Sequence, residues 1–275
     1  MTGLARKFSC FFLLLPALLA ACGGTTNPEP SVENMPTTPV QQSGMGLGVF
    51  KPEGPLFALR KSLTTGTGDI HFKFGQAGDI PLVGDWDGKG GATVGVYRPA
   101  NATFYLRNSH AEGEADVTVA FGVKGDRPIV GDWDGTGTMT IGVYRPSDTT
   151  FYLRNSNTPG VPDLKVKFGG KADLPVAGDW DGNGTATIGV YQPDNLTFLL
   201  RNSNTSGAAE ITVAFGDKGD VPVIGDWDGD KTATIGVYRP SSASFFLRNS
   251  NTLGIANVAV TFGSPGDLPL VGKWD

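Results

Sequence analysis

A short pattern of apolar and polar positions recurs along most of the chain and predicts β-strands. Residues 140–145 are apolar on both faces, which is typical of a strand buried between two sheets. Residues 151–154 form a second β-rich run, and 164–168 alternate in polarity, which indicates one solvent-facing side. Residues 174–180 predict a fourth strand, with Pro175 near its start, where a missing backbone donor is tolerated. Asp-Gly and Asn-Ser-Asn clusters between these runs predict turns.

This four-strand unit is repeated along the chain at a constant interval. The sequence Gly-Asp-Trp-Asp-Gly occurs four times, 47 residues apart, starting at Gly84, Gly131, Gly178 and Gly225. A degenerate copy ends the chain, and because nothing interrupts the interval, five units fit into residues 41–275. Periods of roughly 20–50 residues are typical of solenoids, propellers and arrays. Four strands per unit favour one blade of a β-propeller, a fold with about 4–8 blades.

The two ends of the repeated region predict a closed ring. Residues 46–52 lack the strand that should precede them in a unit, and residues 268–274 supply such a strand with nothing after it. Pairing of these two segments would complete one blade and remove both free edges. The sequence therefore predicts an all-β fold, a five-bladed β-propeller of four-stranded antiparallel blades over residues 46–275. The C-terminal strand is expected to close it by pairing with the N-terminal blade.

The first 45 residues differ from the repeats and predict an exported protein. Arg6 and Lys7 precede an apolar run that is too short to span a bilayer, which fits a secretory signal peptide over residues 1–21. The next segment, Leu-Ala-Ala-Cys ending at Cys22, resembles the lipobox of bacterial lipoproteins, in which the cysteine is acylated. This resemblance implies membrane attachment through Cys22 and a place in the cell envelope, on its periplasmic or extracellular face. An ordinary signal peptide beside an unmodified cysteine is the alternative.

Residues 22–45 combine this cysteine with a polar stretch that predicts a flexible linker. The formal net charge of the chain is −5, which excludes nucleic acid as an expected partner. No catalytic motif is found, and His71 and His110 occupy different positions of the repeat. Pairs of carboxylates recur in the units, whereas a catalytic pair should be unique, and so we predict that the protein is not an enzyme.

The units resemble the FG-GAP and VCBS-type repeats of bacterial surface proteins and integrin-like propellers. The similarity rests on the Phe-Gly pairs and the Asp-Trp-Asp-Gly segments and covers residues 41–275. Five blades of this length are also similar, in number and period only, to tachylectin, a five-bladed sugar-binding lectin. The first resemblance implies loops that bind calcium through clustered carboxylates. Most loops here lack one of these carboxylates, and the best candidate set is Asp226, Asp228 and Asp230.

Two interpretations of the recurring polar and aromatic residues stay open. The aspartates could accept backbone N–H bonds in turns, and the repeated arginines could pair with an aspartate of the Asp-Trp-Asp turn. The tryptophans, which also recur in the units, could likewise be part of the structure of the blade. Alternatively, aromatic rings beside Asn, Asp and Arg suit sugar recognition. Under that hypothesis the first ligand-binding candidates are Trp86, Trp133, Trp180 and Trp227.

These observations predict a lipid-anchored cell-envelope propeller that binds a cell-surface glycan or protein. One weak site per blade would make binding multivalent and increase avidity. A structural or assembly module with no small ligand is one alternative, and a calcium-stabilised module is another. Calcium is the only cofactor that the resemblance suggests.

Overall fold

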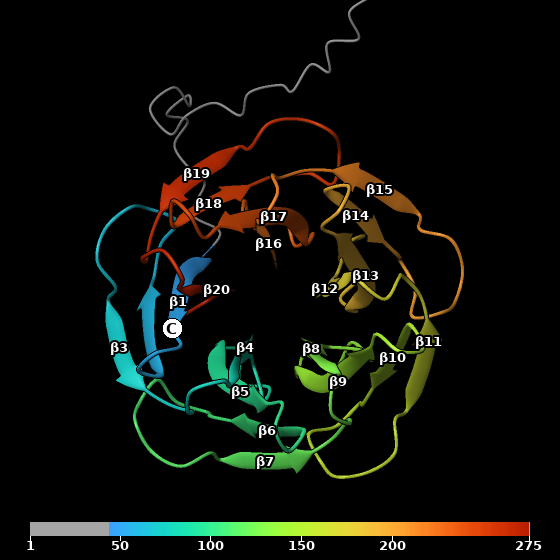
Figure 1. The fold of residues 1–275 in the computed structure, drawn as a ribbon, viewed down its shortest axis with the longest axis horizontal. Helices are drawn as coiled ribbons and strands as arrows, with labels where there is room; N and C mark the ends of the chain where they lie inside the picture. Colours follow the sequence, from blue (N-terminus) through green and yellow to red (C-terminus); the bar gives the residue numbers. More distant parts are fainter. Residues whose placement is uncertain (1–43, 275) are drawn as a thin grey trace, which may run out of the picture.

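The computed structural model describes residues 44–274, whose twenty strands form five four-stranded antiparallel sheets around a central axis (Figure 1). Each sheet is one blade of a β-propeller, and the predicted fold class and blade number are confirmed. This part of the chain contains no helix that could cross a membrane. The predicted signal peptide, Cys22 and nearly all of the predicted linker lie outside the described residues.

The strands of each blade follow one another from the centre of the ring to its rim (Figure 1). Blade A consists of β20 (Leu268–Gly272), β1 (Gly46–Lys51), β2 (Leu56–Arg60) and β3 (Ile70–Lys73). Blade B consists of β4 (Ile80–Gly84), β5 (Thr93–Arg98), β6 (Thr103–Leu106) and β7 (Val117–Ala120). Blade C consists of β8 (Arg127–Gly131), β9 (Thr140–Arg145), β10 (Thr150–Leu153) and β11 (Leu164–Lys167). Blade D consists of β12 (Leu174–Gly178), β13 (Thr187–Gln192), β14 (Thr197–Leu200) and β15 (Ile211–Ala214). Blade E consists of β16 (Val221–Gly225), β17 (Thr234–Arg239), β18 (Ser244–Leu247) and β19 (Val258–Thr261).

The last strand of the chain closes the ring as predicted. β20 pairs antiparallel with β1, and Leu47 lies opposite Val271. Trp274, directly after β20, is buried, and its Nε1 donates a hydrogen bond to the carbonyl oxygen of Leu47 at 3.0 Å. Blade A is therefore assembled from both ends of the described chain. The facing edges of β1 and β20 are hydrogen-bonded to each other.

The hydrophobic core is divided into five seams between neighbouring blades. In the seam between blades B and C, Leu82, Trp86 and Phe104 of blade B pack with Ile141 and Val143 of blade C. The other four seams join A to B, C to D, D to E and E to A in the same way. Because each blade buries both of its faces against its neighbours, one blade cannot form a core alone, and all five depend on closure.

The glycine of each Gly-Asp-Trp segment provides space for the indole ring that follows it. Gly131 is buried at the end of β8, and a Cβ atom there would lie 2.6 Å from Cζ3 of Trp133. No side chain can be added at that distance without displacing the ring. The repeat therefore conserves a small residue at the point where the tryptophan packs back onto its own strand.

The arginines that end the second strand of blades B, C and E make ion pairs, but with a different aspartate from the one predicted. Nε and Nη2 of Arg145 lie 2.9 and 2.8 Å from the carboxylate oxygens of Asp126. Asp126 directly precedes β8, whereas the prediction was an aspartate of the Asp-Trp-Asp turn, which in blade C follows β8. The pair thus holds the connection from blade B to blade C against the end of β9. Equivalent pairs join Arg98 to Asp79 and Arg239 to Asp220.

A second set of arginines, one at the end of the third strand of each blade, stabilises the loop between the third and fourth strands. Arg154 is 8% exposed, and its guanidinium donates hydrogen bonds to the carbonyl oxygens of Val161 and Thr158 and to Oγ of Ser156. Each of the other four donates within its own loop in the same way; these are Arg60, Arg107, Arg201 and Arg248. These arginines therefore have the structural role that their repetition in every unit indicates.

Four buried tyrosines are expected to make the propeller unstable in alkali. Burial raises the pKa of the phenols from 10.0 to about 12 at Tyr97, Tyr144, Tyr191 and Tyr238. Since the unfolded chain loses these protons first, the free energy of unfolding should fall as the pH rises from about 10 to about 12. Denaturant titrations across this range, with phenolate absorbance as a second signal, measure the effect.

Tyr191→Phe is a suitable control for the alkaline effect. The Tyr191 hydroxyl has no hydrogen-bond partner within residues 44–274, so phenylalanine should be tolerated there. The variant is expected to lose less stability above pH 10 than the wild type, because one ionisable phenol is gone. Equal losses in both proteins would show that the buried phenols do not determine alkaline unfolding.

Candidate functional site

The four tryptophans predicted as sugar-stacking platforms lie in the core. Their side chains are between 0% and 5% exposed at Trp86, Trp133, Trp180 and Trp227. Two of the indole Nε1 atoms donate hydrogen bonds to backbone carbonyls, Trp86 to Val94 at 3.1 Å and Trp227 to Ile235 at 3.3 Å. A sugar ring needs an open aromatic face, and so this burial contradicts the prediction that these indoles bind a ligand.

The first aspartate of each Asp-Trp-Asp turn accepts backbone hydrogen bonds. In blade C the two carboxylate oxygens of Asp132 accept the N–H groups of Thr136 and Gly137 at 2.9 and 2.7 Å. Asp85, Asp179 and Asp226 do the same in their loops. In blade B a lysine also enters the loop, and Nζ of Lys89 lies 2.8 Å from Asp87. These contacts support the turn-capping interpretation for most of the loops.

The loop of blade E differs because three carboxylates meet there. One oxygen each from Asp226, Asp228 and Asp230 lies within 4.8 Å of the other two. Desolvation raises the pKa of Asp228, and the charges of Asp230 and Asp226 raise it further. A bound calcium ion would relieve this repulsion, but calcium takes about 6–8 oxygen ligands. The donor set fits calcium as three carboxylates completed by water, although both oxygens of Asp226 already accept backbone N–H groups, Oδ1 from Gly229 at 2.7 Å and Oδ2 from Lys231 at 3.0 Å.

We expect any calcium binding to be weak and to come from this loop alone. With three charged ligands, a dissociation constant of roughly 10⁻⁴–10⁻³ M is expected. Millimolar calcium should raise the melting temperature of the wild type, and Asp230→Asn should remove that rise. Asp134→Asn, in a loop without a third carboxylate, is the matched control and should keep it. No heat in a calcium titration and no melting shift with a chelator would eliminate the metal site.

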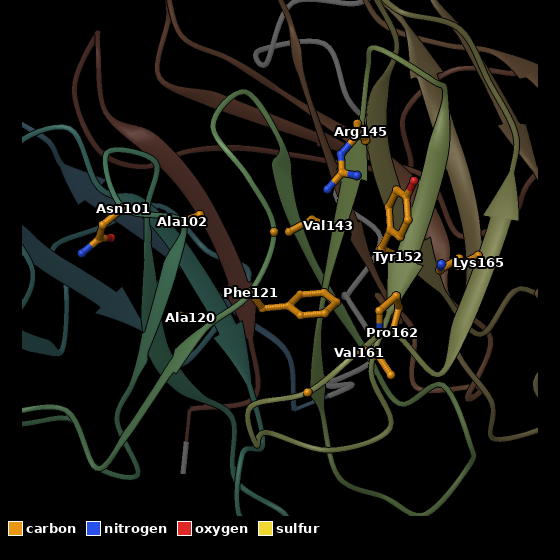
Figure 2. A pocket seen from close by; sticks show the side chains of 12 residues that line it. Asn101, Ala102, Ala120, Phe121, Val143, Arg145, Tyr152, Val161, Pro162 and Lys165 are labelled. Atoms are coloured by element: carbon orange, nitrogen blue, oxygen red, sulfur yellow. The ribbon is translucent and has the colours of Figure 1, made fainter.

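An open cleft between blades B and C carries the residues best suited to hold a ligand. The face of blade C that faces blade B presents Tyr152 on β10, opposite Val143 on β9 and Lys165 on β11. Arg145 lies two residues beyond Val143 and points to the same side. Figure 2 shows the ring of Tyr152 between Arg145 and Lys165. The cleft has a volume of about 400 Å³.

The polar groups of this cleft have fixed positions. Cζ of Arg145 lies 4.3 Å from the centroid of the Tyr152 ring, and Nζ of Lys165 lies 5.8 Å from it. The Tyr152 hydroxyl donates a hydrogen bond to Asp148 at 2.7 Å, which raises the pKa of that phenol. The hydrogen bonds of Arg145 to Asp126 raise the pKa of the guanidinium and keep it charged. Charge, aromatic surface and hydrogen-bonding groups are therefore already assembled before any ligand arrives.

Both ends of the cleft are bounded by loops. The turn before β6 contributes Asn101 and Ala102, and the loop before β11 contributes Val161 and Pro162 (Figure 2). Val161 is 78% exposed, although its carbonyl oxygen is held by Arg154 at 2.7 Å. Exposed apolar side chains on a fixed loop suit contact with a ligand better than contact with water.

The five clefts between blades are not equivalent at these positions. Tyr152 corresponds, at the 47-residue interval, to Ala58, Tyr105, Leu199 and Phe246. Lys165 corresponds to His71, Thr118, Thr212 and Ala259. Repetition preserves the buried seams, whereas the outer side chains of the clefts vary. The combination of a tyrosine with a lysine is found at the B–C cleft and not at the other four.

The reasoning from sequence missed this cleft because it followed the residues that repeat. Tyr152, Arg145 and Lys165 lie on three different strands, and the loop with Asn101 belongs to another blade. Aligning the five units and looking for departures at solvent-facing positions would have identified Lys165. The signal was therefore a break in the repeat, not the repeat itself.

The ring and its clefts define the chain as a five-bladed β-propeller. No protein-family model matches the chain, and no curated protein matches it. Among solved structures it is similar to BBS1N in its complex with ARL6DN, at 11% identity and a TM-score of 0.38; the similarity covers 67% of this chain and only 57% of that one. It is also similar to a lectin of Agrocybe aegerita that recognises non-reducing terminal N-acetylglucosamine, at 14% identity and a TM-score of 0.40, covering 76% and 74% of the two chains. Neither similarity identifies a ligand for this chain.

Proposed function

We propose that this protein is a lipid-anchored propeller of the cell envelope that binds a glycan in the cleft between blades B and C. The observation that carries the proposal is the placement of Tyr152 between two cationic side chains, Arg145 and Lys165, in a cleft of about 400 Å³. Ligand sites are commonly concave, with volumes of about 300–1,000 Å³ and a few convergent polar groups on apolar walls.

The chemistry of the cleft suits a sugar. The C–H face of a pyranose can pack on an aromatic ring and on apolar neighbours such as Val161 and Pro162, which line the cleft. Sugar hydroxyl groups need donors and acceptors nearby, which Lys165 and Asn101 provide. Since the five clefts carry different side chains, the multivalent binding predicted from the repeat would involve unequal sites.

Binding without catalysis fits the contacts of the carboxylates. In the Asp-Trp-Asp turns the first aspartate of each pair accepts two or more backbone N–H groups, for example Asp132 from Thr136 and Gly137. A general acid or base needs an oxygen that is free to exchange a proton with a substrate. These aspartates are engaged in holding their turns.

A protein partner is the second candidate, and one loop of blade E favours it. Leu253 and Ile255 are 77% and 53% exposed, and both lie between β18 and β19. Exposed apolar side chains that cluster on one loop are typical of contact surfaces between proteins. Such a contact would lie two seams away from the B–C cleft, and both could exist on one molecule.

The membrane anchor rests on Cys22 and the lipobox that precedes it. Several acyl chains on one residue make membrane attachment stable, whereas one chain alone gives marginal binding. In fractionated cells the wild type is expected with the membranes and Cys22→Ala in the soluble or unprocessed fraction. Equal distribution of the two proteins would contradict lipid attachment.

A glycan array probed with the full-length protein in detergent tests the binding function. We expect retention on a subset of glycans and at least a tenfold loss with Tyr152→Leu, because the aromatic face is removed while the strand keeps a residue that blade D carries as Leu199. Tyr105→Leu, the same change in the A–B cleft, is the matched control and should bind nearly as the wild type does. Absence of glycan binding, or equal effects of the two variants, would overturn the assignment to this cleft.

A further inference from the structure

Resting on the proposed glycan site, we propose that the B–C cleft selects an acidic saccharide. Lys165 and Lys167 would bind its carboxylate or sulfate group, while the sugar ring packs against Tyr152. The two lysines belong to β11, the outermost strand of blade C, and because they are two residues apart they point to the same side. That side faces blade B, since Lys165 lies opposite Tyr152 and lines the cleft.

The charge of Lys165 contacts the Tyr152 ring, with Nζ 5.8 Å from the ring centroid, but within residues 44–274 no carboxylate neutralises either lysine. Both residues are exposed, and within residues 44–274 neither ammonium group has a hydrogen bond or an ion pair with a carboxylate. By contrast, the cations that end the second strand of a blade are paired: Arg98 with Asp79, Arg239 with Asp220, and Lys51 with Asp267 at 2.8 Å. The charges of Lys165 and Lys167 are therefore available to an anionic ligand, in a chain whose formal net charge is −5.

The acidic side chains around the cleft are already engaged. Asp126 pairs with Arg145, and Asp163 pairs with Arg154 at 3.1 Å. Asp148 accepts the hydrogen bond of the Tyr152 hydroxyl. Arg145 and Lys165 line the cleft, and Lys167, Asp126 and Asp148 lie beside it. These five residues leave one excess positive charge, so an anionic ligand is favoured over a cationic one.

Among the five blades, blade C alone carries lysine at both of these positions. At the two positions equivalent to Lys165 and Lys167, blades B and D both carry threonine and alanine, and blade E carries alanine and threonine. Blade A carries His71 and Lys73. The uncharged residues show that the fold does not need lysine there. Their presence in blade C is therefore best explained by a ligand.

The shape of the cleft favours a saccharide over an acidic peptide. An extended peptide needs a long groove or a free strand edge, and charged side chains on an edge strand oppose the addition of another strand. Here the cleft ends at the turn with Asn101 and at the loop with Val161, which Arg154 holds in place. A cleft of about 400 Å³ with Tyr152 and Phe121 in its lining fits one or two sugar rings.

Titration calorimetry of the full-length protein in detergent tests this inference. The probes are uronic-acid disaccharides of the gluco, galacto and manno series, sulfated galactose, the uncharged counterpart of each, and a tetraglutamate peptide. We expect at least one acidic saccharide to bind at least tenfold more tightly than its uncharged counterpart, and the difference to shrink as salt is added. The carboxylate and sulfate probes separate the two possible anionic groups.

The double variant Lys165→Thr and Lys167→Ala assigns the selectivity to these residues. It introduces the pair that blades B and D already carry, so the fold is expected to be unchanged. Acidic saccharides should bind at least tenfold more weakly, and uncharged ones should bind as before. Lys218→Thr, which removes one exposed lysine from a loop between blades D and E, is the charge control and should change neither.

The possible failures of the two proposals can be distinguished. If uncharged and acidic saccharides bind equally, or if the double variant keeps its acidic selectivity, the inference about the lysines is overturned and the glycan site stands, provided that Tyr152→Leu still weakens binding. If no saccharide binds, both proposals are overturned. Binding of tetraglutamate alone would overturn both in favour of an acidic peptide.

Discussion

Deletion of residues 268–275 is expected to abolish cooperative folding of the whole ring. The deletion removes β20 and with it the antiparallel pairing along β1, from Gly46 to Phe50. It also removes Trp274 and Leu270, which are 3% and 5% exposed and pack in the seam between blades A and B. Loss of one large buried aromatic alone costs about 3–5 kcal/mol, and the total stability of a domain is only about 5–15 kcal/mol.

Circular dichroism melts and size-exclusion chromatography measure this effect. The truncated protein should lose its cooperative melting transition and form aggregates through the newly exposed edge of β1. Trp274→Phe is the control, because it keeps the strand and an aromatic ring in the same seam, and it should melt cooperatively at a lower temperature. A truncated protein with an unchanged melting temperature and no aggregation would show that closure does not stabilise the ring.

Asp126→Ala is expected to lower the free energy of unfolding by about 3–5 kcal/mol, the usual cost of removing one partner of a buried ion pair. The Asp126 side chain is 1% exposed and receives both hydrogen bonds of Arg145. Its Oδ2 also accepts the N–H of Val123 at 2.9 Å. Alanine would leave a charged guanidinium and a backbone donor without their acceptor at the connection between two blades.

The matched control for this prediction comes from blade D. There the position of Arg145 is occupied by Gln192, whose Nε2 donates to Asp173 at 3.2 Å. Arg145→Gln should therefore be accommodated with a loss of about 1 kcal/mol, because one hydrogen bond from a neutral amide replaces two from a charged guanidinium. Urea denaturation of the two variants measures the difference. Equal losses, or a loss below about 1 kcal/mol for Asp126→Ala, would mean that the carboxylate does not hold this connection.

Much of the architecture could be predicted from the sequence because its signals are periodic. The regular spacing of Gly-Asp-Trp-Asp-Gly defines five equal units, and the missing strand before Gly46 matches the extra strand that ends at Gly272. Alternation within 164–168 correctly indicated an outer strand with one side in solvent. Strand alternation depends on neighbours along the chain, and the blade number depends on the count of repeats. Neither requires knowledge of side-chain packing.

The candidate site was predicted less well because motifs do not specify burial. Trp133 was a candidate for ligand binding, yet its ring folds back over Gly131 and is 4% exposed. Arg145 was paired with the turn after β8, whereas the residue that reaches it is Asp126, before β8. For the packing of Trp133 and for the ion pair of Arg145, several contact residues lie at similar distances along the chain. The path of the backbone in space selects one of them.

The sequence by itself determined the number of blades, their strand order and the closure of the ring, because strand alternation and a constant repeat length are one-dimensional properties. It also carries the prediction of a lipid anchor at Cys22. Only the tertiary structure decided which side chains are buried in the seams and which face the clefts. Tyr152, Lys165 and Asn101 become neighbours because two blades pack face to face, and that contact joins residues whose separation in the chain has no relation to their distance in space.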